Sequence, residues 1–112
     1  MLVILNSKAT KQDIKKASED YESFIKITVD IVKEIVIIGG EYHYDAEQEL
    51  LRMGSKQEDI LGGGINLGTK VFATNALINM RPRFNQSAEI LNEKKRLIFL
   101  KIAKKYLDVL FK

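Results

Sequence analysis

The sequence predicts a single α+β domain over residues 1–112. A chain of 112 residues is one domain by size, and an apolar content of 46% is enough for a hydrophobic core. Segments with the two-residue period of strands are mixed with segments of helical period, without strict βα alternation. We therefore expect a mixed sheet of about five strands with three helices, in the order β-α-β-β-α-β-β-α.

The first half of the chain predicts a strand, a helix and a hairpin. The apolar run MLVIL, residues 1–5, is typical of a buried strand. Residues 11–23 carry apolar side chains at helical spacing after a Thr-x-x-Asp pair that resembles a capping box. Residues 25–31 alternate apolar and polar side chains, and residues 35–40 are a second β-branched run that ends in two glycines. Together they indicate a hairpin.

A short helix is expected over residues 46–53. Asp45 would be its N-cap and Gln48 would complete a capping box. Gly54 would end it, since glycine readily adopts the left-handed conformation that follows a helix.

A second strand pair is expected over residues 60–67 and 71–80, ending before Pro82 because proline cannot donate to a ladder. Its glycines are expected to permit a bulge or a sharp turn. The stretch GGINLGTK ends in Thr-Lys instead of the Lys-Ser/Thr of a P-loop, and Leu67 replaces the third glycine of a dinucleotide fingerprint. The sequence therefore predicts no cofactor.

The last predicted element is a long helix over residues 89–111. Five of its charged side chains, Lys94, Lys101, Lys105, Asp108 and Lys112, fall on one narrow stripe. Its apolar side chains cover about 220° of the circumference. Either the helix is buried between other elements, or its surplus apolar face meets a second copy of the chain, which predicts a homodimer through the C-terminal helix.

Composition bounds the location and the partners. There is no cysteine, so disulfides and thiolate metal sites are excluded. The longest apolar runs are about five residues, whereas a spanning helix needs roughly 20, and the N-terminus lacks the features of a signal peptide. We expect a cytoplasmic protein that does not bind a membrane.

Charge is divided unevenly along the chain. Residues 1–60 carry 8 basic and 12 acidic side chains, and residues 61–112 carry 10 basic and 3 acidic ones. This asymmetry is compatible with a nucleic-acid surface or with two halves that attract each other. The basic residues form no run and aromatic residues are few, so nucleic acid is the less favoured partner.

The only histidine lies in GGEYHYDAEQ, residues 39–48. If the segment is extended, Glu41, His43 and Asp45 point to the same side. Two carboxylates and an imidazole could bind a divalent metal or perform acid–base chemistry. The spacing specifies no metal, however, so no metal site is predicted. The plainer alternative is that Asp45 caps the helix, Glu41 pairs with an arginine and His43 is packed or solvated.

A second polar group is expected at the end of the last strand. Asn75, Asn79 and Arg81 share a parity and therefore one face of that strand. The guanidinium of Arg81 suits a carboxylate or a phosphate. Asn85 and Ser87 would follow at the N-terminus of the last helix, where anions are favoured, with Ser87 as an N-cap in the alternative interpretation.

The stretches GGEYHYD, GSKQEDI, GINL and LINMRPRFNQS, taken together, resemble an uncharacterised family of small prokaryotic proteins, domain of unknown function five-six-seven-four. The resemblance covers roughly residues 25–100. The chain departs from the family pattern at LGGG, where Trp-Gly is usual, at Ala76 and at Phe84. The resemblance implies no activity. It implies polar positions that we take as candidate ligand-binding residues: Glu41, His43, Asp45, Gln57, Asp59, Asn66, Asn79, Arg81 and Ser87.

Two classes of function follow. In the first, the protein binds a small anionic molecule in a polar pocket, with Glu41 and Arg81 facing each other across it. In the alternative, it is a small hydrolase or nuclease-like enzyme that uses Glu41, His43 and Arg81, with or without a divalent metal. An enzyme requires these side chains to converge in a concave pocket.

Overall fold

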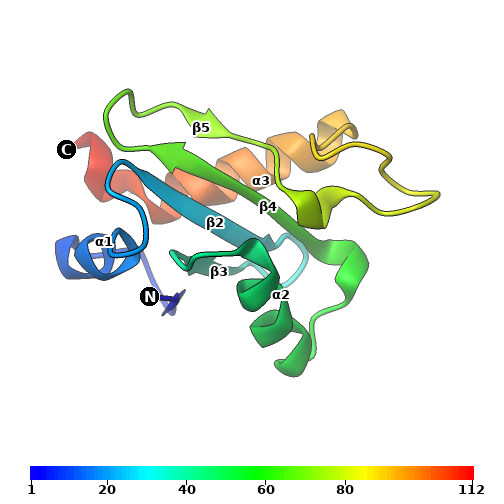
Figure 1. Ribbon diagram of the computed structural model, residues 1–112, viewed down its shortest axis with the longest axis horizontal. Coiled ribbons are helices and arrows are strands. Elements are labelled where there is room, and N and C mark those ends of the chain that lie inside the picture. Colours follow the sequence, from blue (N-terminus) through cyan, green and yellow to red (C-terminus); the bar gives the residue numbers. More distant parts are fainter.

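The computed structural model describes residues 1–112 and contains one five-stranded sheet with helices on both faces (Figure 1), which confirms the α+β class. The strands are β1 (Val3–Leu5), β2 (Phe24–Asp30), β3 (Ile35–Ile38), β4 (Ile60–Asn66) and β5 (Phe72–Ala73), in the sheet order β1-β3-β2-β4-β5. The helices are α1 (Lys11–Ala17), α2 (His43–Arg52) and α3 (Glu93–Tyr106), with 3-10 turns η1 (Gln57–Asp59), η2 (Leu77–Asn79) and η3 (Asp108–Phe111). Every strand pair is antiparallel, whereas a mixed sheet was expected.

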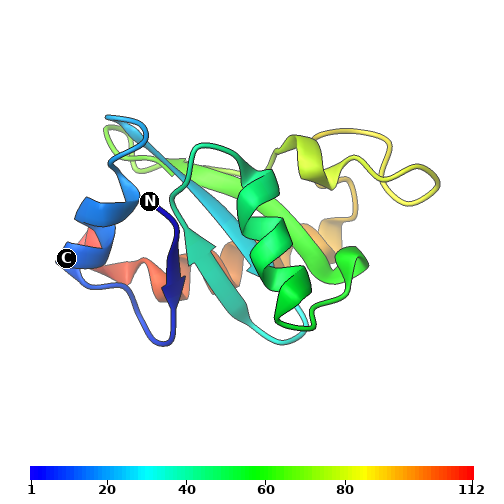
Figure 2. The ribbon, with the colours of Figure 1, turned by 60° about the horizontal axis from the view of Figure 1, so that its bottom comes forward.

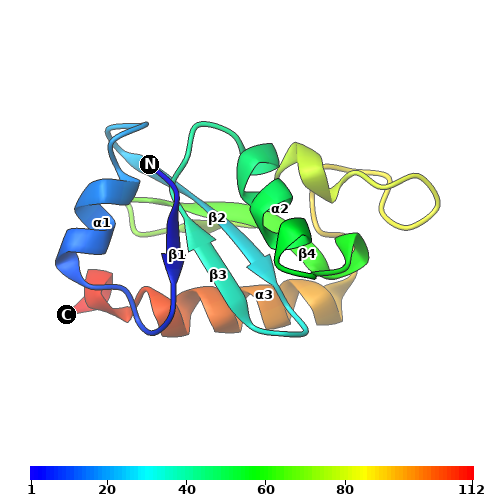
Figure 3. The ribbon, with the colours of Figure 1, turned by 90° about the horizontal axis from the view of Figure 1, so that it is seen from below.

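The sheet separates two hydrophobic cores. Alternate side chains of β2, among them Ile25, Ile27 and Val29, face α3 and α1 and belong to the larger core with Phe99. On the opposite face α2 packs against the sheet through a smaller cluster, made by Ile37, Ala46, Leu50 and Ile60. Figures 2 and 3 show α2 and α3 on opposite sides of the strands. The two-residue period of β2 therefore sends its remaining side chains toward α2.

The predicted hairpin is confirmed as β2 and β3, which pair from Ile27↔Ile38 to Asp30↔Ile35. Its turn is closed by the Asp30 side chain, which accepts from the backbone N–H groups of Val32 and Lys33, each at 2.9 Å. Asp30 is fully buried and also accepts from the Ser55 hydroxyl at 2.6 Å. These three donors satisfy a buried carboxylate that would otherwise be costly.

Two helices begin or end where the sequence did not indicate. The capping box before α1 is confirmed, but α1 ends at Ala17 and not at residue 23. Helix α2 begins at His43, and its N-cap Tyr42 makes no side-chain cap bond, so the prediction that Asp45 is the N-cap is wrong. Gly39 and Gly40 have φ of 86° and 91°, which lets the chain reverse directly after β3 and start the helix early.

The second half departs further from the expectation. Strand β4 is confirmed, but β5 has only two residues, and the 3-10 turn η2 stands where the strand was expected to continue to residue 80. Helix α3 begins at Glu93, and Asn92 caps it by accepting from the Lys95 N–H at 2.9 Å. Ser87 is therefore not the N-cap. Its hydroxyl closes a turn by accepting from the Glu89 N–H at 3.1 Å.

The expected bulge in the glycine run is absent, because β4 pairs with β2 in unbroken register from Phe24↔Asn66 to Asp30↔Ile60. The glycines instead allow close packing. A Cβ at Gly63 would lie 2.7 Å from Cζ of the buried Phe99 on α3. The glycine therefore lets the phenylalanine ring lie directly against the sheet.

Much of the apolar surface of α3 packs into the larger core, including Phe99, Ile102 and Ala103, while Leu97 remains 56% exposed. The homodimer through this helix stays a prediction. None of the helices combines the length and the apolar character that crossing a membrane requires.

Candidate functional site

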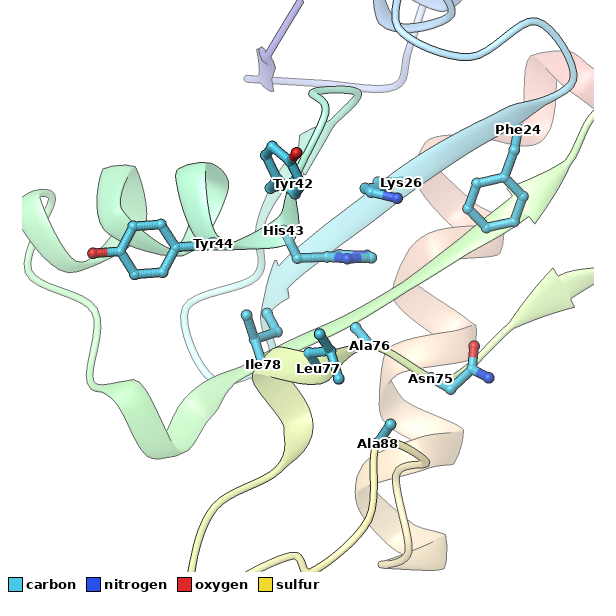
Figure 4. Close-up of a pocket in the computed structure, with 10 residues that line it drawn as sticks. All are labelled: Phe24, Lys26, Tyr42, His43, Tyr44, Asn75, Ala76, Leu77, Ile78 and Ala88. Carbon is cyan, nitrogen blue, oxygen red and sulfur yellow. The ribbon is translucent and has the colours of Figure 1, made fainter.

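A hollow of about 470 Å³ lies on the face of the sheet that carries α2 (Figure 4). Phe24 and Lys26 of β2 contribute one wall, and residues 42–44 at the start of α2 contribute a second. Residues 75–78, together with Ala88, close the third side. Seven of the ten lining residues are hydrophobic, and the remaining three are Lys26, His43 and Asn75.

Two glycines of β4 create the space for this hollow. A Cβ on Gly62 would lie 2.9 Å from Cδ2 of His43 and 2.8 Å from the Cβ of Ala76. A Cβ on Gly64 would overlap the ring of Phe24. Because neither glycine has a side chain, the imidazole and the phenyl ring both lie against the sheet.

His43 is the first residue of α2, and its Nε2 lies 2.6 Å from the carbonyl oxygen of Gly63. Burial lowers the pKa of His43 below the ordinary 6.5, and the charge of Lys26 lowers this pKa further, while the bond to Gly63 raises it. The imidazole is therefore neutral at pH 7. Nε2 carries the proton that it donates to the carbonyl, which leaves Nδ1 as an acceptor. In Figure 4 the ring points into the hollow.

Lys26 supplies the positive charge of the hollow. Its Nζ lies 4.5 Å from the ring centroid of Tyr21 and 5.9 Å from that of Phe24. None of the six salt bridges in the structure involves Lys26. The ammonium is thus held by aromatic faces and has no carboxylate partner, which leaves it able to bind an anion.

The three residues of the histidine motif do not share a side, so the predicted triplet is wrong. His43 and Asp45 lie in a helix, where residues two apart point in nearly opposite directions. Glu41 and Asp45 are exposed, and the backbone carbonyl of Glu41 accepts from the Tyr21 hydroxyl at 2.8 Å. No three His, Cys, Asp or Glu side chains lie close enough together anywhere in the chain to hold a metal ion.

Arg81 pairs with Glu47 and not with Glu41, which contradicts the predicted pocket between Arg81 and Glu41. Its Nη2 lies 2.9 Å from the Glu47 carboxylate, and the two side chains are only 15% and 6% exposed. The same nitrogen donates to the carbonyls of Gln57 at 3.0 Å and Ile60 at 3.2 Å. This is a closed structural ion pair. Arg81 Nε is buried without a hydrogen-bond partner.

Asn79 is buried and takes the place of a neighbouring strand beside β4. Its Oδ1 accepts from the Gly62 N–H at 2.8 Å, and its Nδ2 donates to the Gly62 and Ala88 carbonyls, each at 2.9 Å. Asn85 ties the following loop together, since its Nδ2 donates to three carbonyls and its Oδ1 accepts from the Leu91 N–H. We refer to Glu47, Asn79, Arg81 and Asn85 as the polar clasp.

The remaining candidates have local roles. The Asn66 side chain accepts from the N–H groups of Gly68 and Thr69 and so closes the turn after β4. Gln57 bonds through its carbonyl to Arg81, and the Asp59 carbonyl accepts from the Ile31 N–H at 2.9 Å. Of the nine candidate residues, His43 alone lines the hollow.

Sequence reasoning missed Phe24, Lys26 and Glu47. Glu47 was detectable, because a helix that starts at His43 places residues 43, 46, 47 and 50 on one face at the spacing of a buried stripe. For Phe24 and Lys26 of β2, the sequence indicated only that they belong to one face of an alternating strand. Their position opposite Gly64 and Asn66 depends on the pairing of β2 with β4, which the sequence alone does not specify.

Comparison with known proteins places the chain in a family. No curated protein and no solved structure matches it. The model of a family described as protein of unknown function (DUF5674) matches residues 3–106, almost the whole chain. The resemblance inferred from the sequence is thereby confirmed, and the chain belongs to this family of proteins of unknown function.

Proposed function

We propose that the protein is a binding module that holds a small molecule with an apolar body and one anionic group in the hollow beside His43. The observation that carries the proposal is Lys26, a half-buried cation without a carboxylate partner in a hollow with mostly apolar walls. A ligand carboxylate or phosphate would supply the missing charge. The interaction would be stronger here than on an open surface, because low-dielectric walls screen it less.

The other groups of the hollow define the rest of the ligand. Phe24, Ala76 and Leu77 offer apolar surface for a planar or aliphatic body. The acceptor Nδ1 of His43 suits an N–H or O–H donor on the ligand. A volume of about 470 Å³ lies within the usual range for small-molecule sites.

The hollow favours binding over catalysis. The enzyme alternative requires Glu41, His43 and Arg81 to converge. Arg81 is held in the polar clasp, Glu41 is exposed, and His43 Nε2 is engaged by a backbone carbonyl. The lining of the hollow contains no Asp, Glu, Ser, Thr or Cys side chain that could act together with His43 as a carboxylate partner or a nucleophile.

A thermal-shift screen with small aromatic and aliphatic carboxylates and phosphates tests the proposal. A ligand at about 100 times its Kd should stabilise the protein by about 2.7 kcal/mol. The variant Lys26→Met keeps the aliphatic stem and should lose that stabilisation. Lys11→Met removes the same charge from the exposed surface of α1 and should retain it. The proposal would be contradicted if a ligand stabilised Lys26→Met as much as Lys11→Met. It would also be contradicted if no anion stabilised the wild type.

We also propose a cytoplasmic location and a homodimer through the C-terminal helix, as expected from the sequence. The exposed side chains of Leu91 and Leu97, 57% and 56% accessible, support a contact near the start of α3. Light scattering at micromolar concentration tests the dimer, and a mass near 12.8 kDa would contradict it.

A further inference from the structure

A second hollow, of about 460 Å³, lies at the opposite end of the molecule between the turn after β4 and the C-terminus. In Figure 1 the C-terminal end of the chain lies beside that turn. Two aromatic rings line the hollow, Phe72 of β5 and Phe111 of η3, with centroids 6.0 Å apart and planes at 21°. Phe111 is 54% exposed, so one face of this stacked pair is accessible to another planar group.

Lysines surround this aromatic pair. Lys70 and Lys104 line the hollow, and Lys8 and Lys112 lie 2.9 Å and 3.6 Å from Asp108, which is its only acid. Because Asp108 is already paired with Lys8 and Lys112, Lys70 and Lys104 are left as two lysines of the lining without a carboxylate partner. Two such ammonium groups suit a ligand that carries more than one negative charge, such as a chain of phosphates.

The basic surface continues along α3. Lys101 is exposed on the turn before Lys104, and neither forms a salt bridge. Residues three apart on a helix are neighbours on one face, so Lys101 lies beside Lys104, which lines the hollow. The sequence hides this arrangement, because Phe72 and Phe111 are far apart along the chain and the lysines between them form no run.

We propose that this end of the molecule binds single-stranded nucleic acid, with phosphates on Lys70, Lys101 and Lys104 and a base stacked on Phe111. Lysines that follow a backbone beside an exposed aromatic ring are the general means of binding single strands without reading sequence. A duplex keeps its bases stacked on each other and offers none to Phe111. The pairing of cations with an accessible ring therefore favours a single strand over a duplex.

Fluorescence anisotropy with a short labelled thymidine oligonucleotide tests this inference. Three phosphate contacts predict a log–log salt dependence with a slope of roughly −2. The double variant Lys101→Gln/Lys104→Gln should weaken binding at least roughly tenfold and leave a slope nearer −0.7. The matched variant Lys15→Gln/Lys16→Gln removes the same charge from exposed positions on α1 and should bind like the wild type.

The variant Phe111→Leu separates stacking from charge. It keeps an apolar contact with Phe72 and should weaken oligonucleotide binding roughly tenfold while leaving heparin binding unchanged. Three results would overturn the inference: no binding at low salt, equal loss in the α1 control, or duplex binding as tight as single-strand binding with no effect of Phe111→Leu. Doubling of the mass in high salt without oligonucleotide binding would instead assign this face to a second copy of the chain.

Discussion

The polar clasp and the hollow beside His43 lie on the same face of the sheet, and they differ in how their polar groups are satisfied. In the clasp, Asn79 and Asn85 use both ends of their amides, and Arg81 pairs with Glu47 in a site that solvent barely reaches. In the hollow, Lys26 lacks a carboxylate partner and His43 keeps one ring nitrogen as an acceptor.

The comparison separates residues that hold the fold from residues that can bind a ligand. Removing one partner from a buried polar group whose partners are all internal destabilises the fold, and such a group has no free donor or acceptor for a ligand. A half-buried charge without a partner contributes little to stability and remains available. Substitutions in the clasp should therefore change stability, and substitutions in the hollow should change binding.

The largest expected effect is the loss of the clasp ion pair. Glu47→Ala leaves the buried guanidinium of Arg81 without its carboxylate and should lower the free energy of unfolding by about 3 kcal/mol. Lys26→Met in the hollow should change it by less than about 0.5 kcal/mol. Denaturant melts of the two variants measure the difference. Similar midpoints would contradict the claim that the clasp, and not the hollow, determines stability.

A double variant sharpens that result. Glu47→Leu/Arg81→Met removes both charges and also the unpartnered Arg81 Nε. Replacing a buried ion pair by apolar side chains of similar volume is often neutral, so this variant should recover most of the stability that Glu47→Ala loses.

The next effect concerns the glycines that make room for the hollow. Gly62→Ala places a methyl group against His43 and Ala76 and should cost about 1–3 kcal/mol through overpacking. Gly68→Ala, in the turn after β4, meets only the Asn66 side-chain oxygen at 3.3 Å and should cost less than about 1 kcal/mol. Equal costs in denaturant melts would show that the space above Gly62 is not tightly filled.

The elements with local signals were predictable from the sequence, and the site was not. The alternation in β2 and the β-branched run of β3 indicated the hairpin, since each residue reports its own face of the sheet. The early start of α2 depends on the positive φ of Gly39 and Gly40, and this moved Asp45 out of the capping position. The strand expected through Asn79 is missing because one side-chain amide satisfies Gly62 in its place.

The hollow itself arises from long-range register. Lys26 pairs with Gly64, and Phe24 with Asn66, although these partners are 38 and 42 positions apart in the chain. A glycine run can signal a bulge, a turn or a close approach, and only the pairing distinguishes them. The sequence identified His43 as a residue of interest but not the neighbours that define its chemistry.

The pH dependence of stability reports on His43. Its pKa is lowered in the folded protein, mainly by burial, so below pH 6.5 the unfolded chain binds a proton that the folded protein does not. Stability should be complete above pH 6.5, decline as the pH falls below it, and level off beneath the lowered folded-state pKa. Denaturant melts of the wild type and His43→Asn should diverge in this window, and parallel curves would contradict the assignment.

Lys26 links the same titration to the hollow. Because its charge contributes to lowering the pKa of His43, Lys26→Met should move this pKa back toward 6.5. His43 is the only histidine, so its ring protons in an NMR titration report the change without ambiguity. An unchanged His43 pKa in Lys26→Met would show that the Lys26 ammonium lies too far from the imidazole to influence it.

The smallest expected effect compares two helix N-termini. Asp45 is exposed in the first turn of α2 and makes no cap bond, so Asp45→Ala removes only a favourable interaction with the helix dipole, about 0.5 kcal/mol. Asn92→Ala at the start of α3 removes a real cap bond to the Lys95 N–H and should cost about 1 kcal/mol. Salt should abolish the Asp45 effect, because a charge–dipole interaction at the surface is screened, and should leave the Asn92 effect largely intact. Denaturant melts at low and high salt would measure both, and a salt-independent loss of about 1 kcal/mol in Asp45→Ala would restore Asp45 as a cap.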